Sequence, residues 1–444
     1  MNEVGFLEQF LPEFKGLVGF FQPGVYHCYT GDEHTIIALQ NVEKLQYQDN
    51  QLSRIFKLLK SKDLLYLSIL LHDIGKPISI SGHEIIGAEI ANSIMQYLGY
   101  GQKEIAFVQF LIKNHLVMEQ VSFRRNLNDP STLDTFTEIF PSIEALDHLY
   151  LLTYADLSAV SPAVWTQWKA DLLYELYRKA KAMLVEQLSG HELISAKSLE
   201  VLNNEQISSD DLIIEHLEQM DDISYLFHFT QDEINQHIEE IEKGSKISTF
   251  FKENETFTNI TVITKDSDSL LAKLCGALSI NDLNIYDARI FTRKDGIVID
   301  SFNVTDFRTN KAIESNRYGK IEVSLNKVLT GEILIDKEVK KFKSKWKRLH
   351  NNQYNPKKKI SINFEKHKLY TIIDVHAPDS IGLLYKITHK MVALGLTVYL
   401  AKISTQIDSV VDAFYVLKNN GEKLQESEYE FISSELISEI RETE

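Results

Sequence analysis

An internal repeat in the C-terminal half constrains the fold of this 444-residue chain more than any other feature. Residues 265–273 align with residues 378–386 at an offset of 113 positions. The match continues at the same offset in the pairs Ala288/Ala401, Ile290/Ile403, Thr292/Thr405 and Asp295/Asp408. After one deletion the offset becomes 112, in the pairs Asp300/Asp412, Phe302/Phe414 and Val304/Val416. A match this long, through helical and extended patterns alike, predicts two copies of one fold.

Each copy follows the order strand–helix–strand–strand. In the first copy, β-branched runs at 259–264, 285–292 and 297–304 predict strands, and the apolar stretch 270–280 predicts a helix. That order opens a ferredoxin-like unit. We therefore expect one α+β domain at 256–338 and a second at 367–444.

Between the copies, residues 339–366 form a basic, polar segment. Its lysines favour a solvated helix and linker, and a docking surface for an acidic partner is the alternative.

The N-terminal part differs, because its apolar residues recur at helical spacing between glycines and prolines. Residues 1–185 therefore predict an all-α domain, and 186–255 predict a more acidic helical extension. The expected fold is multidomain: a helical domain followed by two α+β ferredoxin-like domains.

Composition limits the partners and the compartment. The chain has 47 Lys and Arg against 63 Asp and Glu, a net charge of −16, which disfavours binding to a nucleic acid backbone. Its densest apolar run, residues 64–71, is far shorter than the about 20 residues that span a bilayer. The N-terminus does not resemble a signal peptide, and the two cysteines are far apart. We expect a cytoplasmic protein that binds neither nucleic acid nor membrane.

The chemistry is concentrated in a few histidines and aspartates. His72 and Asp73 follow an apolar helix and precede Gly75, which ends it. Imidazole nitrogen and carboxylate oxygen together suit Mn²⁺, Fe²⁺ or Zn²⁺. Each residue alone would be ordinary, but further candidates occur on separate predicted helices, namely His34, His83, His115 and Asp156.

These histidines and aspartates, in their order along the chain, resemble the pattern of a known enzyme family. The order His34, His72-Asp73, Asp156 is the signature of HD-domain phosphohydrolases, in which these four residues bind one metal ion. His83 and His115 match histidines that bind a second ion in some members.

The resemblance implies a cofactor of one or two divalent ions (Mn, Fe, Zn or Mg). It implies that Asp73 bridges them and orients a water. Lys76, Arg124 and Arg125 would bring positive charge to a phosphate.

Other motifs narrow the likeness, among them Asp32-Glu33-His34-Thr35, Gly82-His83-Glu84, Phe123-Arg124-Arg125-Asn126 and Met220-Asp221-Asp222-Ile223-Ser224-Tyr225-Leu226. They resemble the family of bifunctional uridylyltransferase/uridylyl-removing enzymes of bacterial nitrogen control. That family begins with a nucleotidyltransferase domain, which this sequence lacks, so the chain is expected either to be a fragment or to lack the transferase half. The implied activity is removal of uridylyl groups from a PII-type signal protein. Hydrolysis of a free nucleotide or alarmone, or a non-catalytic sensor with a structural HD domain, are the alternatives.

The two copies resemble ACT domains, which bind small amino acids at paired interfaces. Asp379, Ser380, Gly382 and Leu383 match the family's turn, where a helix N-terminus favours a ligand carboxylate. The first copy has Ser269 in place of Gly382, which weighs against a ligand there. The resemblance implies that glutamine binds and stimulates hydrolysis, and that the protein forms a homodimer. The alternative is that both copies serve packing alone.

Overall fold

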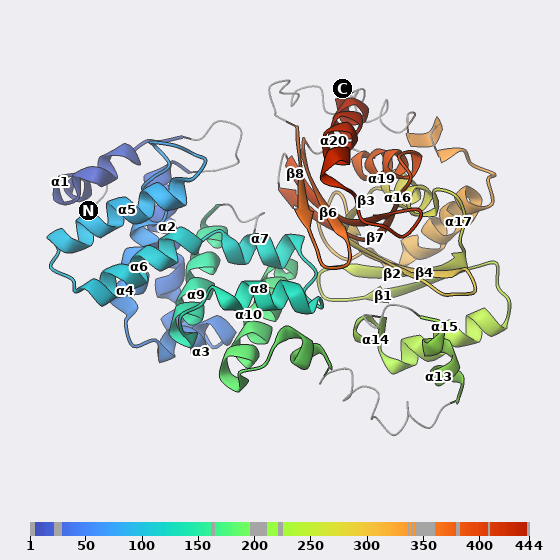
Figure 1. Cartoon of the computed structure of the whole chain (residues 1–444), viewed down its shortest axis with the longest axis horizontal. Coiled ribbons are helices and arrows are strands. Elements are labelled where there is room, and N and C mark those ends of the chain that lie inside the picture. The colour runs from blue at the N-terminus through green and yellow to red at the C-terminus, as the bar shows by residue number, and fades with distance from the viewer. Residues whose placement is uncertain are drawn as a thin grey trace. The chain divides into compact units, whose positions relative to one another are not determined.

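A computed structural model of the chain describes residues 5–21, 29–160, 165–195, 211–220, 225–335, 337–339, 341, 360–378, 382–406 and 409–441. It contains two compact units, Met1–Ile194 and Ser195–Glu444 (Figure 1). Each unit has its own hydrophobic core.

The first unit is helical. Its elements are α1 Phe6–Phe10, the short 3₁₀ helix η1 Pro12–Gly16, α2 Gly31–Lys44, η2 Leu45–Tyr47, α3 Gln51–Leu58, α4 Lys62–Leu71, α5 His83–Tyr97, α6 Gln102–Asn114, α7 Val117–Arg124, α8 Pro130–Glu138, α9 Ile143–Val160 and α10 Gln167–Glu186. Helix α9 is apolar on most of its faces and is buried along most of its length. It packs against α2, α4, α6, α7 and α10, so it forms the centre of the unit.

The second unit is a single antiparallel sheet with the strand order β1-β2-β4-β3-β7-β8-β6-β5. The strands are β1 Ile247–Glu253, β2 Thr258–Lys265, β3 Leu283–Thr292, β4 Ile297–Asp306, β5 Ser361–Lys366, β6 Thr371–Ala377, β7 Leu396–Gln406 and β8 Ser409–Lys418.

Helices cover this sheet on its two faces (Figure 1). On one face lie α16 Leu270–Ile280, α17 Tyr318–Leu329, α19 Leu383–Ala393 and α20 Glu426–Arg441, which share the larger core. On the opposite face of the first copy lie α13 Asp211–Glu218, α14 Tyr225–His228 and α15 Gln231–Glu242. Successive side chains of β2 alternate between the two cores, as strand geometry requires: Val262 faces one and Ile263 the other.

The repeat is confirmed at the level of strand register. Ala288 stands opposite Phe302, and their counterparts Ala401 and Phe414 stand opposite each other in the second copy. Both copies also share an irregularity at the same place, between residues 285 and 287 and between 398 and 400. Strands β3 and β7 join the copies, with Ala288 opposite Ala401. The two copies are therefore related by a pseudo-two-fold axis between these alanines, and the predicted fold class is confirmed.

Each copy begins with a strand that the sequence analysis did not predict. Strand β1 lies in the stretch 186–255 that was predicted helical, and β5 lies in the predicted linker 339–366. In β1, Phe251 packs on the larger core and Phe250 on the opposite one. Because both faces of β1 are covered, its sequence does not alternate between polar and apolar residues. Its few apolar residues can therefore be taken for the end of the preceding helix.

Two further expectations concern the basic segment between the copies and membrane-spanning helices. Of the basic segment Lys340–Lys359, only Lys341 belongs to the described residues, so the choice between linker and docking surface stays a prediction. Within the described ranges, no helix combines the length and the apolar character needed to cross a lipid bilayer.

Candidate metal centre

The six predicted metal ligands come together in the first unit. They form two groups, and in each group the potential ligand atoms lie within 4.8 Å of one another. The first group is His34, His72 and Asp156, and the second is Asp73, His83 and His115. They come from separate helices: His34 from α2, Asp156 from α9, His83 from the start of α5, and the others from the residues that follow α4 and α6.

Asp73 lies between the two groups. Its Oδ2 is 3.4 Å from Nε2 of His72 and 3.9 Å from Nε2 of His34. Its Oδ1 is 3.5 Å from Nε2 of His83 and 3.9 Å from Nε2 of His115. One carboxylate thus faces both groups with different oxygens, which is the geometry of a bridging ligand.

Three of the histidines are oriented by the backbone. In His72, His83 and His115, Nδ1 lies 2.7–2.8 Å from the carbonyl oxygen of the residue three positions earlier. A carbonyl oxygen only accepts hydrogen bonds, so Nδ1 carries the proton and Nε2 presents a lone pair. Such anchoring bonds fix the tautomer and the ring plane of metal-binding histidines.

The donor atoms fit a cation. Nε2 of His83 and Nε2 of His115 lie only 3.2 Å apart, although both present lone pairs. Nε2 of His72 and Oδ1 of Asp73 are buried and make no hydrogen bond within the described part of the chain. Burial and the neighbouring His72 lower the pKa of His115 to about 4, so a proton is a poor partner at neutral pH. A divalent ion would satisfy all of these atoms.

Without such an ion, the centre keeps a proton. Burial opposes charge on His72, but the adjacent Asp73 and Asp156 outweigh it and raise the pKa of His72 to about 10. Burial also opposes ionisation of the Asp73 and Asp156 carboxyls. The charges of His72 and Lys76 nevertheless hold the pKa of Asp73 well below its usual range, and the hydrogen bond from His34 with the charge of His72 does the same for Asp156. Two ionised carboxylates therefore surround an imidazolium.

The predicted phosphate-binding residues lie in different surroundings. Nζ of Lys76 donates to Oδ2 of Asp73 at 2.6 Å, so this lysine touches the ligand set. Arg124 ends α7, and its charge acts on Glu119. Arg125 donates from Nη1 to the carbonyl oxygen of Arg124 at 3.0 Å.

Two charged residues beside the centre were missed by the sequence analysis. Glu119 on α7 is influenced by the charges of Lys76 and Asp156, and Lys169 on α10 is influenced by Glu119. A sequence signal existed for Lys169, because Thr166 caps α10 and places this lysine in its first turn. A cation there opposes the helix dipole, so its presence calls for another reason.

In the second unit, only part of the predicted amino-acid site can be described. Asp379 and Ser380 lie outside the described residues. Gly382 precedes α19 in the left-handed conformation (φ 74°), and Leu383 is the buried first residue of the helix. Its counterpart Ser269 has the same conformation (φ 59°), at which a side chain is strained.

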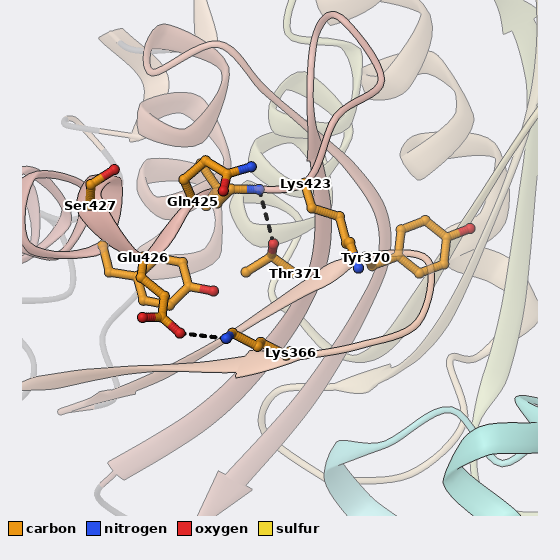
Figure 2. A pocket seen from close by; sticks show the side chains of 9 residues that line it. Lys366, Tyr370, Thr371, Lys423, Gln425, Glu426 and Ser427 are labelled. Carbon is orange, nitrogen blue, oxygen red and sulfur yellow. Dashed lines mark hydrogen bonds and ion pairs between the residues drawn. The ribbon is translucent and has the colours of Figure 1, made fainter.

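A hollow in the second copy lies away from that turn. Figure 2 shows it between the start of β6 and the start of α20. Its volume is about 550 Å³. The backbone N–H of Leu424 donates to Oγ1 of Thr371 at 3.1 Å across it, and Lys366 pairs with Glu426 at its rim (Figure 2). Thr371 begins β6 and Gly382 follows its end, so the hollow and the predicted site are at opposite ends of this strand.

Comparison with known proteins agrees with this centre. Residues 31–139 match the model of the HD domain, a range that contains every predicted ligand except Asp156. The first unit therefore contains an HD domain, which supports the predicted phosphohydrolase class.

Two curated relatives show which enzymes the chain is similar to over nearly its whole length. A bifunctional uridylyltransferase/uridylyl-removing enzyme of Azospirillum brasilense is 31% identical over 94% of this chain and 46% of its own length. One of Vibrio cholerae is 30% identical over 100% of the chain and 51% of its own length. The predicted resemblance is confirmed, and the chain spans about half the length of the curated relatives it matches.

Proposed function

We propose that the first unit hydrolyses a phosphodiester and that its substrate is a uridylylated PII-type signal protein. The observation that carries this proposal is the position of Asp73 between two groups of ligand atoms. The relatives' name, which includes uridylyl removal, supports the substrate. The same kinship supports a cytoplasmic location.

The ligand roles are part of the proposal. His34, His72 and Asp156, with Oδ2 of Asp73, would hold one divalent ion, and His83 and His115, with Oδ1, would hold a second. The mixture of nitrogen and oxygen donors favours Mn²⁺, Fe²⁺ or Zn²⁺ over Mg²⁺, which prefers oxygen. When bound, such ions lower the pKa of a coordinated water to about 7 and stabilise charge on phosphoryl oxygens.

The side chains of the protein would position the reactants. Asp73 would orient the attacking water by accepting one of its hydrogen bonds, while Lys76, with its ammonium 2.6 Å from Asp73, would bring positive charge to a phosphoryl oxygen. The uridylyl group would be held through a tyrosine side chain of the PII-type protein. Water oxygen forms the new bond to phosphorus, and the bond from phosphorus to that tyrosine oxygen breaks. The products are uridine monophosphate and the unmodified PII-type protein, whose tyrosine oxygen receives the proton.

We further propose that the second unit senses an amino acid, glutamine, and transmits its presence to the hydrolase. The pseudo-two-fold arrangement of the copies and the left-handed Gly382 before α19 support an ACT-type site. Pairing of these units between chains would give a homodimer.

The proposal is tested by loading the purified chain with Mn²⁺, Fe²⁺ or Zn²⁺ and measuring metal content. The same samples are then assayed with bis-p-nitrophenyl phosphate and with a uridylylated PII-type protein, with and without glutamine. Turnover should require metal and should be lost in Asp73→Asn and Asp156→Asn. Asp63→Asn, an exposed change on α4, should keep it. A chain that holds metal at the centre and turns over neither substrate overturns the proposal.

A further inference from the structure

Lys169 carries an ammonium group without an ordinary partner. This side chain is partly buried, yet in the described part of the chain its Nζ makes no hydrogen bond and no ion pair. It lies over the ring of Phe123, 5.5 Å from the ring centroid. Contact with an aromatic face satisfies little of a group that has three N–H donors.

The carboxylate whose charge acts on Lys169 is that of Glu119, and the two side chains do not pair directly. Glu119 acts on Lys169 through space, and no ion pair joins their side chains. Burial raises the pKa of Glu119 and lowers the pKa of Lys169, so each is shifted towards its neutral form. A structural ion pair shifts its two members the other way, because each stabilises the charge of the other.

The location of this pair places it beside the metal centre. Helix α7 begins two residues after His115, and α10 packs against α7. The carboxyl of Glu119 is influenced by Asp156, by Lys76 and by Arg124 in addition to Lys169. The charges of three cations, Lys76, Arg124 and Lys169, thus act on one carboxylate that also senses the metal-ligand candidate Asp156.

We propose that Lys169 is a substrate-binding residue, whose ammonium donates hydrogen bonds to the phosphate of a nucleoside monophosphate ester, and that Glu119 positions it. An anionic phosphate would supply the acceptor that Lys169 lacks. This inference rests on the proposed hydrolase function. It adds a residue of α10, which lies outside the HD domain match because that match ends at residue 139.

The test compares Lys169→Met, Lys169→Arg and the matched control Lys181→Met. Lys181 lies on the same helix and pairs with Asp147 at 2.9 Å, away from this pair. Two quantities are measured on the metal-loaded chain: binding of uridine monophosphate by calorimetry, and KM and kcat for a p-nitrophenyl ester of that nucleotide. Removal of a charged hydrogen bond should weaken nucleotide binding and raise KM at least about tenfold in Lys169→Met. Metal content should not change in any variant. Lys169→Arg should bind the nucleotide nearly as well as the unsubstituted chain, and Lys181→Met should match the unsubstituted chain in binding and in KM.

A double variant covers the case in which Lys169→Met leaves Glu119 uncompensated and the chain misfolds. Lys169→Met with Glu119→Gln removes both charges, so it should fold and keep its metal while binding the nucleotide weakly. Nucleotide binding equal to that of the unsubstituted chain, in either variant, overturns the assignment. Because binding is measured apart from turnover, a chain that binds the nucleotide through Lys169 but hydrolyses nothing would refute the hydrolase and leave this site standing.

Discussion

Gly75 offers the sharpest test of how the fold sets the two ligand groups. The residue follows the His72-Asp73 pair and passes directly beneath the start of α5. A Cβ added at Gly75 would lie 2.3 Å from the carbonyl oxygen of His83 and 2.9 Å from the backbone nitrogen of Gly87. Both are backbone atoms, so no side-chain rotation relieves the overlap.

The size of the effect follows from that distance. To reach the 3.4 Å of an ordinary contact, the start of α5 in Gly75→Ala must move by about 1 Å. Overpacking of this kind costs about 1–3 kcal/mol, or about 2–12 °C in Tm for a unit of this size. Metal–ligand distances tolerate changes of only about 0.2 Å. His83 should therefore leave the second group, while His34, His72 and Asp156 keep the first.

The assay is thermal unfolding combined with metal analysis of Gly75→Ala. We expect a lower Tm and a loss of one ion per chain relative to the unsubstituted protein. The control is Gly319→Ala in α17, where an added Cβ meets nothing within 4 Å and should stabilise the helix by up to about 1 kcal/mol. If Gly75→Ala keeps both its Tm and its metal content, Gly75 does not lie against the backbone of His83 and Gly87 in solution.

Three further predictions concern the electrostatics and the second unit. Because the pKa of His72 is raised to about 10 in the metal-free centre, binding of Mn²⁺ at pH 7.5 should release about one proton. The release is measured by calorimetry in two buffers of different ionisation enthalpy. No release would contradict a protonated His72 between Asp73 and Asp156. Burial lowers the pKa of His216 to about 3 and of His237 to about 4, so both stay neutral in the folded chain. The second unit should therefore be fully stable above pH ~6.5 and, as the pH falls below that value, lose up to about 1.4 kcal/mol of unfolding free energy per histidine and pH unit. Urea unfolding that is unchanged between pH 7 and pH 5 would refute this. Ser269→Gly should raise stability by about 1 kcal/mol through relief of its left-handed backbone, whereas Gly382→Val should abolish any response of hydrolysis to glutamine; equal responses in both variants would remove the second copy as the sensing site.

The sequence predicted the fold best where its pattern was repeated. The strands and the helix of the first copy were predicted to within about two residues, because two independent copies carry the same spacing of apolar positions. The edge strands β1 and β5 were not predicted. Strand β1 has both faces packed and therefore lacks alternation, and β5 is a short run beside a strongly basic segment. Pairing with β2 or β6, which is a tertiary interaction, decides their conformation.

The metal ligands are placed by features of the nearby sequence, whereas the charged residues beside them are placed by the packing of distant helices. His72 and His115 directly follow α4 and α6, where the last carbonyl groups of a helix lack partners. A histidine at that position can satisfy one of those carbonyls with Nδ1 and point Nε2 away, so a helix end followed by His already predicts an oriented ligand. Lys169 and Glu119 carry no such local rule. Their relation to the centre arises only from the packing of α10 on α7, which no spacing within either helix encodes.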